Sequence, residues 1–159
     1  MCKNIISVTG HPNSGHVKLA YKLSLNSAVE FIHPFTDDPK DTYFEYHQVS
    51  KEKLDELMDT HEVLSVTMID GYRFVFFKEQ LVADYNVLIL DDYALADLKG
   101  KYDRLYSIKC WSSCQGDSDR VGVYLYNHEF SKVFQYEADS VEELEWEIEE
   151  YFMNNHDME

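Results

Sequence analysis

The stretch VTGHPNSGHVKLA, residues 8–20, holds two glycines, Gly10 and Gly15, between two patterned segments. KNIISVT, residues 3–9, is a β-branched run that predicts a short buried strand. HVKLAYKLSL, residues 16–25, has apolar residues near helical spacing and predicts a helix. Strand, glycine loop and helix, in this order, are the context of a phosphate-binding loop, G-x-x-x-x-G-K-[ST]. The two glycines have the spacing that this loop requires.

The positions that follow the second glycine depart from that motif. His16 stands where the loop lysine belongs, and Val17 stands where a Ser or Thr hydroxyl would hold magnesium. Histidine has a reference pKa of ~6.5 and a shorter reach than lysine, so it is mostly neutral at pH 7. Lys18 comes two positions late, on a different face of the helix. The loop is therefore expected to lack both the cation and the metal ligand of phosphoryl transfer.

Length and composition predict one soluble domain. The chain has 159 residues, of which 45% are hydrophobic, enough for one sizeable core. No run approaches the ~18 apolar residues of a membrane span, and the N-terminus reads as a first strand rather than a signal peptide. Cys110 and Cys114 are spaced C-x3-C without a second pair, which favours reduced thiols over a zinc site. We expect a cytoplasmic protein without a metal site and without membrane contact.

The net charge of −16 is spread unevenly along the chain. From Glu137 onward there are ten acidic residues and no lysine or arginine, whereas residues 1–136 carry 14 basic and 20 acidic residues, a net of −6. Nucleic acid is bound by neutralising its phosphates, so direct nucleic-acid binding is not expected. An acidic segment attracts a basic protein surface, although it is also typical of a well-solvated helix face.

The rest of the chain alternates between strand and helix patterns. Asp70-Gly71 divides the β-rich stretch 61–77 and predicts a hairpin. The apolar run NVLILDD, residues 86–92, predicts a central parallel strand. Helices are expected at 50–59 and 95–100, a loop at 33–43, and strands at 104–111, 120–127 and 132–138. This order predicts an α/β fold, a P-loop NTPase-like parallel sheet flanked by helices.

The last helix, DSVEELEWEIEEYF at residues 139–152, has the clearest pattern. Ser140 and Glu143 have the spacing of a capping box. An apolar stripe runs through Val141, Leu144, Ile148, Tyr151 and Phe152. Trp146 lies on the opposite side, about 140–160° from the stripe centre by helical geometry. It is expected either to cover a neighbouring loop or to anchor a partner. The partner-binding candidates are Glu143, Trp146, Glu147 and Glu150.

Three segments together resemble the guanylate kinases. YHQVS, residues 46–50, is similar to the Y-x-F-V-S segment of that family, and the hairpin and the strand ending in Asp91-Asp92 follow it in the family's order. The resemblance covers roughly residues 3–111. It implies a single guanylate-kinase-like domain over 1–159, with 33–83 as the region of the nucleoside-binding β-insert and 137–159 as an acidic C-terminal helix.

The resemblance also implies nucleotide-binding positions. In this family the glycine loop binds ATP phosphates, and the β-insert with an arginine loop binds GMP. Tyr46 matches the tyrosine at the GMP phosphate, and Asp91 matches the acidic residue near the guanine, with Asp92 an equally good alignment. The full matched set is Gly10, Asn13, Ser14, Gly15, His16, Lys40, Tyr46 and Asp91.

Further departures from the family extend beyond the loop. Asp37 falls where the first GMP-phosphate arginine should be, and a carboxylate there is expected to repel a phosphate. Ser65 falls where a hairpin glutamate reads guanine. The lid segment is short and carries a single arginine, Arg120. Phosphoryl transfer depends on positioned charge around the phosphates, and single contacts of this kind are worth ~10³ or more. ATP or GMP binding would therefore come without turnover, so the sequence favours a pseudoenzyme.

Three functions remain open from the sequence. The first is a catalytically inactive domain that binds or inhibits a protein with a basic surface. The second is a nucleoside monophosphate kinase with residual nucleotide binding, in which Lys18 or Lys40 replaces a lost cation. The third is an acidic mimic of nucleic acid. Small acidic phage proteins sometimes act in this way, and a degenerate enzyme of this size would suit a phage genome.

Overall fold

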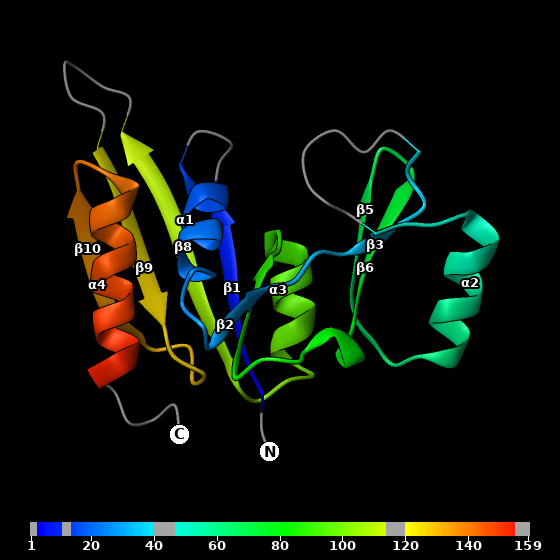
Figure 1. Cartoon of the computed structure of the whole chain (residues 1–159). Helices are drawn as coiled ribbons and strands as arrows, with labels where there is room; N and C mark the ends of the chain where they lie inside the picture. Colours follow the sequence, from blue (N-terminus) through cyan, green and yellow to red (C-terminus); the bar gives the residue numbers. More distant parts are fainter. Residues whose placement is uncertain (1–2, 11–13, 40–46, 114–119, 155–159) are drawn as a thin grey trace.

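The computed structural model describes residues 3–10, 14–39, 47–113 and 120–154. These residues form a six-stranded sheet and a separate four-stranded sheet (Figure 1). Asn13, Lys40 and Tyr46, three of the predicted nucleotide-binding residues, lie outside the described residues. Among the described helices, none is both long enough and apolar enough to pass through a bilayer.

The larger sheet has the order β10-β9-β8-β1-β7-β2. Its strands are β1 (Asn4–Gly10), β2 (Val29–Phe31), β7 (Tyr85–Ile89), β8 (Leu105–Ser113), β9 (Arg120–Tyr126) and β10 (Lys132–Ala138). The first four in chain order pair in parallel, and β1 lies between β7 and β8, which is why all but its last residue are buried. The NVLILDD segment forms β7, an interior parallel strand between β1 and the edge strand β2 rather than a strand at the centre of the sheet.

The predicted parallel sheet is confirmed for β1, β2, β7 and β8, whereas β9 runs antiparallel to both β8 and β10. Six residues separate Ser113 from Arg120, and a parallel return would need a crossover of a dozen or more. The short connection therefore forces a hairpin at this edge of the sheet. The sheet as a whole remains mostly parallel.

Helices cover both faces of the larger sheet. On one face α1 (His16–Leu23) and α4 (Val141–Asn154) pack together, and Leu19, Leu144 and Ile148 reach the core there at 1% exposure or less. On the other face α3 (Asp92–Lys99) buries Leu95 and Leu98. The predicted flanking helices are thus confirmed. In Figure 1, α3 lies between the two sheets.

The smaller sheet falls between β2 and β7 in the chain. It has the order β4-β3-β6-β5, with β3 (Phe35–Thr36), β4 (His47–Gln48), β5 (Val63–Ile69) and β6 (Tyr72–Phe77). Helix α2 (Lys51–Thr60) packs on it through Leu54, which contacts Val75 and Phe77 in a small core of its own. The prediction of a loop over 33–43 is wrong at Phe35–Thr36, because β6 supplies a strand partner that local sequence does not show.

Local signals set several boundaries. At the β5–β6 turn, Asp70 and Gly71 have φ values of 53° and 85°, as a type I′ hairpin requires. The Ser50 hydroxyl accepts the Lys53 N–H at 3.0 Å and caps α2. Helix α3 begins three residues earlier than the predicted 95–100, since the Asp91 carboxylate accepts the Ala94 N–H at 2.8 Å. Its predicted end at Gly100 is correct.

The acidic C-terminal helix is confirmed over Val141–Asn154. The Ser140 hydroxyl accepts the Glu143 N–H at 3.3 Å, which is one half of the predicted capping box. The apolar stripe faces inward as expected, with Val141, Leu144 and Ile148 buried. Trp146 is 57% exposed, so it faces solvent on the side away from that stripe.

Candidate functional site

A cavity of about 230 Å³ lies between the two sheets, at the carboxyl ends of β1 and β7. This edge is where open α/β sheets bind their ligands. The larger sheet and its connections contribute Gly10, His16, Ile89, Leu90 and Asp91. The hairpin and the segment before β3 contribute Pro34, Thr67, Ile69, Phe74 and Phe76. The cavity is therefore mainly apolar, with one carboxylate and one imidazole among its lining groups.

The two loop glycines have packing roles, and Gly10 is the one that lines the cavity. A Cβ on Gly10 would lie 2.3 Å from the Ser14 hydroxyl oxygen and 3.2 Å from Cβ of Cys110. Gly15 has φ +80°, and a Cβ there would lie 2.7 Å from a methyl of Val141. The loop backbone thus packs directly against β8 on one side and against α4 on the other. Both positions need glycine for packing, whatever the loop binds.

Ser14 turns its side chain back into the loop. It is 1% exposed, and its hydroxyl lies 3.2 Å from Nδ1 of His16. The same hydroxyl sits against Gly10, at the point where a Cβ would collide with it. A serine hydroxyl and an imidazole therefore fill the space beside the loop glycine. The structure thus brings three of the predicted loop residues, Gly10, Ser14 and His16, into contact with one another.

Lys18 does not stand in for the missing loop lysine. Its ammonium lies 2.8 Å from Oε1 of Glu142 on α4, and Lys22 lies 3.8 Å from the same oxygen. The hydrogen bond from Lys18 is the main cause that holds the pKa of Glu142 below its ordinary value. The pairing directs Lys18 along the α1–α4 surface and away from the cavity. No local pattern indicates this pair, because the two residues are 124 positions apart.

Of the two aspartates that align equally well with the guanine-binding position, Asp91 is the one that lines the cavity. Asp91 lines the cavity and caps α3 with the same carboxylate. Asp92 is the first residue of α3 and is absent from the lining residues of this cavity. The carboxylate that faces the cavity is therefore already anchored by a helix N–H, which fixes its orientation.

Asp37 is not an unpaired negative charge, because Arg73 neutralises it. Oδ1 of Asp37 accepts the Arg73 backbone N–H at 2.9 Å, and Oδ2 accepts its Nε–H at 3.1 Å. Burial alone would raise the pKa of Asp37, but these hydrogen bonds outweigh it and the pKa lies below its ordinary value. Nη1 of Arg73 also donates to Asp55 on α2 at 2.7 Å. The expectation that Asp37 repels a phosphate therefore needs correction.

Ser65 plays no part in the cavity lining. It is 1% exposed, pairs across the hairpin with Phe76, and is not among the lining residues. Among the described residues its hydroxyl has no hydrogen-bond partner. The position that reads guanine in the family resemblance is here a small side chain inside the packing of the smaller sheet.

A second candidate surface lies on the outer side of α4, around Trp146. By helical spacing its neighbours one turn away are Glu142, Glu143, Glu149 and Glu150. Glu143 is exposed, and Glu150 is half-buried. The predicted partner-binding set is brought together except for Glu147, which lies about 100° around the helix from Trp146. Glu142 and Glu149 complete the ring and were not among the predicted residues.

The α4 glutamates nearest α1 are crowded. Burial and the charge of Glu149 raise the pKa of Glu145 above its ordinary value. The charge of Lys22 acts in the opposite direction and does not offset them. The lysines of α1, Lys18 and Lys22, therefore do not balance the negative charge of the α4 glutamates. A cation brought to this helix would relieve that repulsion.

Comparisons with known proteins bear on the fold. No family description matches the chain, and no curated protein matches it. A crystal structure of guanylate kinase from Anaplasma phagocytophilum is similar in fold, with a TM-score of 0.51 and 16% sequence identity. The match covers 66% of this chain and 58% of that chain. The chain therefore has a guanylate-kinase-like fold over the matched part, and it spans little more than half the length of that enzyme.

Proposed function

We propose that this protein is a catalytically inactive guanylate-kinase-like domain that binds a basic protein surface through the outer face of α4. The observation that carries the proposal is Trp146, which is 57% exposed at the centre of a ring of glutamates. Large aromatic side chains at well-presented surface positions are typical anchors of protein interfaces. The proposal assigns Trp146 this role rather than that of a cover for a neighbouring loop.

The chemistry of this face favours a cationic partner. A Lys or Arg side chain over an indole ring gains about 0.5–2 kcal/mol, depending on how much water is excluded. Glu142 is already paired with Lys18, so Glu143, Glu149 and Glu150 would steer such a group toward the ring and pair with its neighbours. The opposite face of α4 is held rigidly by Leu144 and Ile148, which are 1% and 0% exposed. The helix that carries the surface is therefore already ordered, and the remaining ordering cost on binding is that of its exposed side chains.

Loss of catalysis is supported by the charges at the loop. His16 and Val17 replace the cation and the metal ligand, and Lys18 is engaged with Glu142. Among the described residues that line the cavity, His16 is the only group able to carry a positive charge. A triphosphate in the cavity would face Asp91 with little compensation. We expect no measurable phosphate transfer from ATP to GMP.

Trp146 fluorescence tests the partner chemistry directly. The chain has two tryptophans, so the variant Trp111→Phe isolates the signal of Trp146. An arginine-rich peptide should quench this signal at low salt, and Trp146→Phe should remove the response. Tyr93→Ala, which removes an aromatic residue that is 89% exposed on α3, should leave peptide binding unchanged. Equal binding by Trp146→Ala and the parent protein would refute the assignment of this face.

Recovery of natural partners complements the peptide experiment. In affinity capture from cell lysate, the parent protein should recover a partner protein in stoichiometric amount, and Trp146→Ala should not recover it. If that protein also binds DNA, competition between DNA and this chain identifies nucleic-acid mimicry. The variant with Glu143, Glu147 and Glu150 changed to glutamine would then lose the competition. Insensitivity to those changes would count against mimicry.

Retained nucleotide binding is a second candidate, favoured by the cavity of about 230 Å³ that Asp91 lines. Its apolar walls from Phe74 and Phe76 suit a purine ring. Calorimetric titration with GMP and with ATP measures binding, and a coupled assay measures turnover. Binding of GMP that Asp91→Asn weakens, without turnover, would support this candidate. Turnover at ordinary enzyme rates would overturn the inactive assignment.

A further inference from the structure

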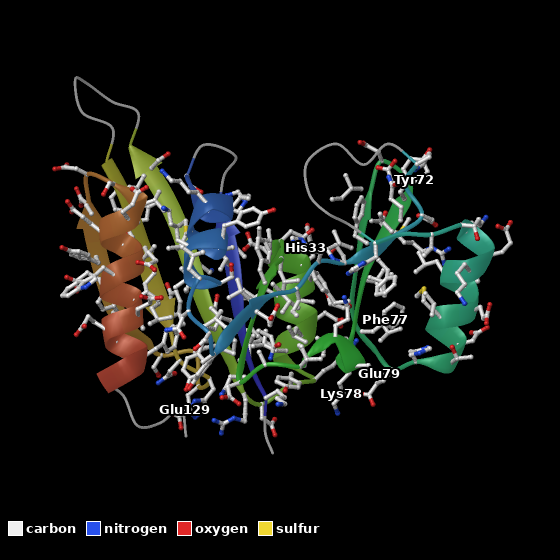
Figure 2. The ribbon with its side chains drawn as sticks, in the orientation of Figure 1. His33, Tyr72, Phe77, Lys78, Glu79 and Glu129 are labelled. Atoms are coloured by element: carbon white, nitrogen blue, oxygen red, sulfur yellow. The ribbon has the colours of Figure 1, made fainter. Side chains whose placement is uncertain are left out.

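A basic pocket of about 480 Å³ opens at the edge of the larger sheet opposite the Gly10–His16 loop. It is lined by Lys3, Lys78, Leu81, Lys101, Tyr102, Asp103 and Arg104. Lys3 precedes the first residue of β1, whereas Gly10 ends that strand, so the two edges lie ~20 Å apart along it. Figure 2 shows Lys78 at the end of the molecule where Figure 1 places the N-terminus.

The lining of this pocket is net positive, whereas the whole chain is net negative. Its lining holds four cations and one carboxylate, Asp103, in a protein of net charge −16. Two of the cations have exposed partners, Lys78 with Glu62 at 3.4 Å and Lys101 with Asp97 at 2.9 Å. Within the described ranges, Lys3 and Arg104 have no carboxylate at ion-pair distance. The Lys3 ammonium donates only to the carbonyl of Val82 at 3.3 Å.

Arg104 is held in a defined orientation. Its Nε–H donates to Oδ1 of Asn4 at 2.8 Å, and Asn4 is 2% exposed and anchored to the Asp84 carbonyl through its own Nδ2. In the described part of the chain, the two terminal amino groups of Arg104 have no recorded partner. A guanidinium fixed at Nε presents its terminal donors with little further loss of side-chain freedom, which suits a bidentate oxyanion.

Helix electrostatics accounts for part of this cluster. Lys101 follows the C-terminus of α3, where a positive charge is favourable, and it pairs with Asp97 one turn back. The same reason does not apply to Lys3 or Arg104, which precede β1 and β8 and come from separate parts of the chain. Strand order alone brings them together, because β1 and β8 are neighbours in the sheet.

We propose that this pocket binds a small organic anion bearing at least two negative charges, in phosphate or carboxylate groups. Arg104 would take one oxyanion through its terminal donors, and Lys3 and Lys101 would pair with the other charges. Leu81 and the ring of Tyr102 supply an apolar surface for the body of the ligand. The volume falls within the usual range for small-molecule sites. This site is independent of the α4 face and of the cavity at the loop.

Titration with inorganic pyrophosphate and with citrate tests the pocket and separates the two anion types. The ¹⁵N NMR signal of the Arg104 Nε–H should shift on binding, since Nε belongs to the guanidinium whose terminal amino groups would hold the oxyanion. Arg104→Gln should weaken binding by about tenfold or more, as expected for loss of a charged hydrogen-bonding group. Lys3→Gln should weaken it by a smaller factor and leaves the Asn4–Arg104 bond intact.

Lys132→Gln is the matched control, because it removes the same charge from an exposed position on β10. Thermal unfolding of each variant identifies any that fails to fold. If Arg104→Gln fails to fold, the binding measured for Lys3→Gln decides the outcome. Equal weakening by Lys3→Gln and Lys132→Gln would mean general charge attraction and would overturn the site. Self-association that Lys3→Gln abolishes, without response to either anion, would also overturn it.

Discussion

The two edges of the larger sheet, at the carboxyl and the amino ends of its parallel strands, differ in the charged side chains that line their pockets. At the carboxyl edge, beside Gly10 and the start of α1, the cavity lining has His16 and Asp91 but no lysine or arginine among the described residues. At the amino edge, four cations line one pocket. The fold places ligands at one edge, whereas the side chains place positive charge at the other. Backbone architecture therefore does not by itself say where an anion is bound.

The largest expected effect concerns the smaller sheet, which forms one wall of the carboxyl-edge cavity. Arg73→Ala leaves Asp37 buried without its cation and detaches α2 at Asp55, so we expect a loss of about 3 kcal/mol in the free energy of unfolding. Urea denaturation measures it. Lys53→Ala, which removes an exposed pair with Glu56, should change stability by less than about 0.5 kcal/mol.

Gly15→Ala tests whether the loop glycine is needed for packing. The φ of +80° and the 2.7 Å approach to Val141 predict a loss of about 2–3 kcal/mol, from backbone strain and overpacking together. Gly71→Ala shares the positive φ, at +85°, but has open space around its Cβ, so about 1 kcal/mol is expected. Equal losses of unfolding free energy in the two variants would contradict close packing of Val141 on α4 against Gly15.

Acid unfolding is a second test of the Asp37–Arg73 ion pair in the smaller sheet. The pKa of Asp37 is lower in the folded chain than the ~3.9 of an unfolded aspartate. Its stabilisation is therefore fully present above about pH 4 and is lost as pH falls through the folded pKa. Asp37→Asn should be less stable than the parent at pH 7, and this difference should shrink below pH 4. A constant difference across this range would contradict the Arg73–Asp37 pairing.

Restoring charge at the carboxyl edge would sharpen the comparison between the two edges. His16→Lys with Val17→Ser rebuilds the loop motif and should raise ATP affinity by about tenfold, equivalent to ~1.4 kcal/mol. Calorimetry measures it with and without magnesium. Val17→Ser alone supplies a control that leaves the charge unchanged. No gain in the double variant would indicate that Ser14 and the loop packing, rather than the missing cation, exclude phosphate.

The smallest expected effect is that of Trp146→Ala on stability. Because the side chain is 57% exposed and lies away from the buried stripe, the free energy of unfolding should change by no more than about 0.5 kcal/mol. Thermal denaturation measures it. A loss above about 2 kcal/mol would instead mean that the ring covers part of the fold. That result would remove the main support for a partner surface on α4.

Local patterns predicted most elements and few of the contacts between them. The Asp70-Gly71 turn, the Ser50 cap and the stripe of α4 each depend on residues within a few positions, so the sequence shows them directly. The strand Phe35–Thr36 was missed because its partner is β6, about 40 residues later. The strand β9 was predicted, but its antiparallel direction was not, although the short connection before it indicates a hairpin.

The sequence by itself determined the guanylate-kinase-like order of elements, the loss of the loop lysine and the acidic last helix. Only the tertiary structure decided that Arg73 neutralises Asp37, that Lys18 pairs with Glu142, and that Lys3 and Arg104 share one pocket. The physical reason is the separation along the chain between the residues that interact. Periodicity, caps and turns arise between near neighbours in the chain, whereas ion pairs and pockets arise where strand order and helix packing bring distant residues together.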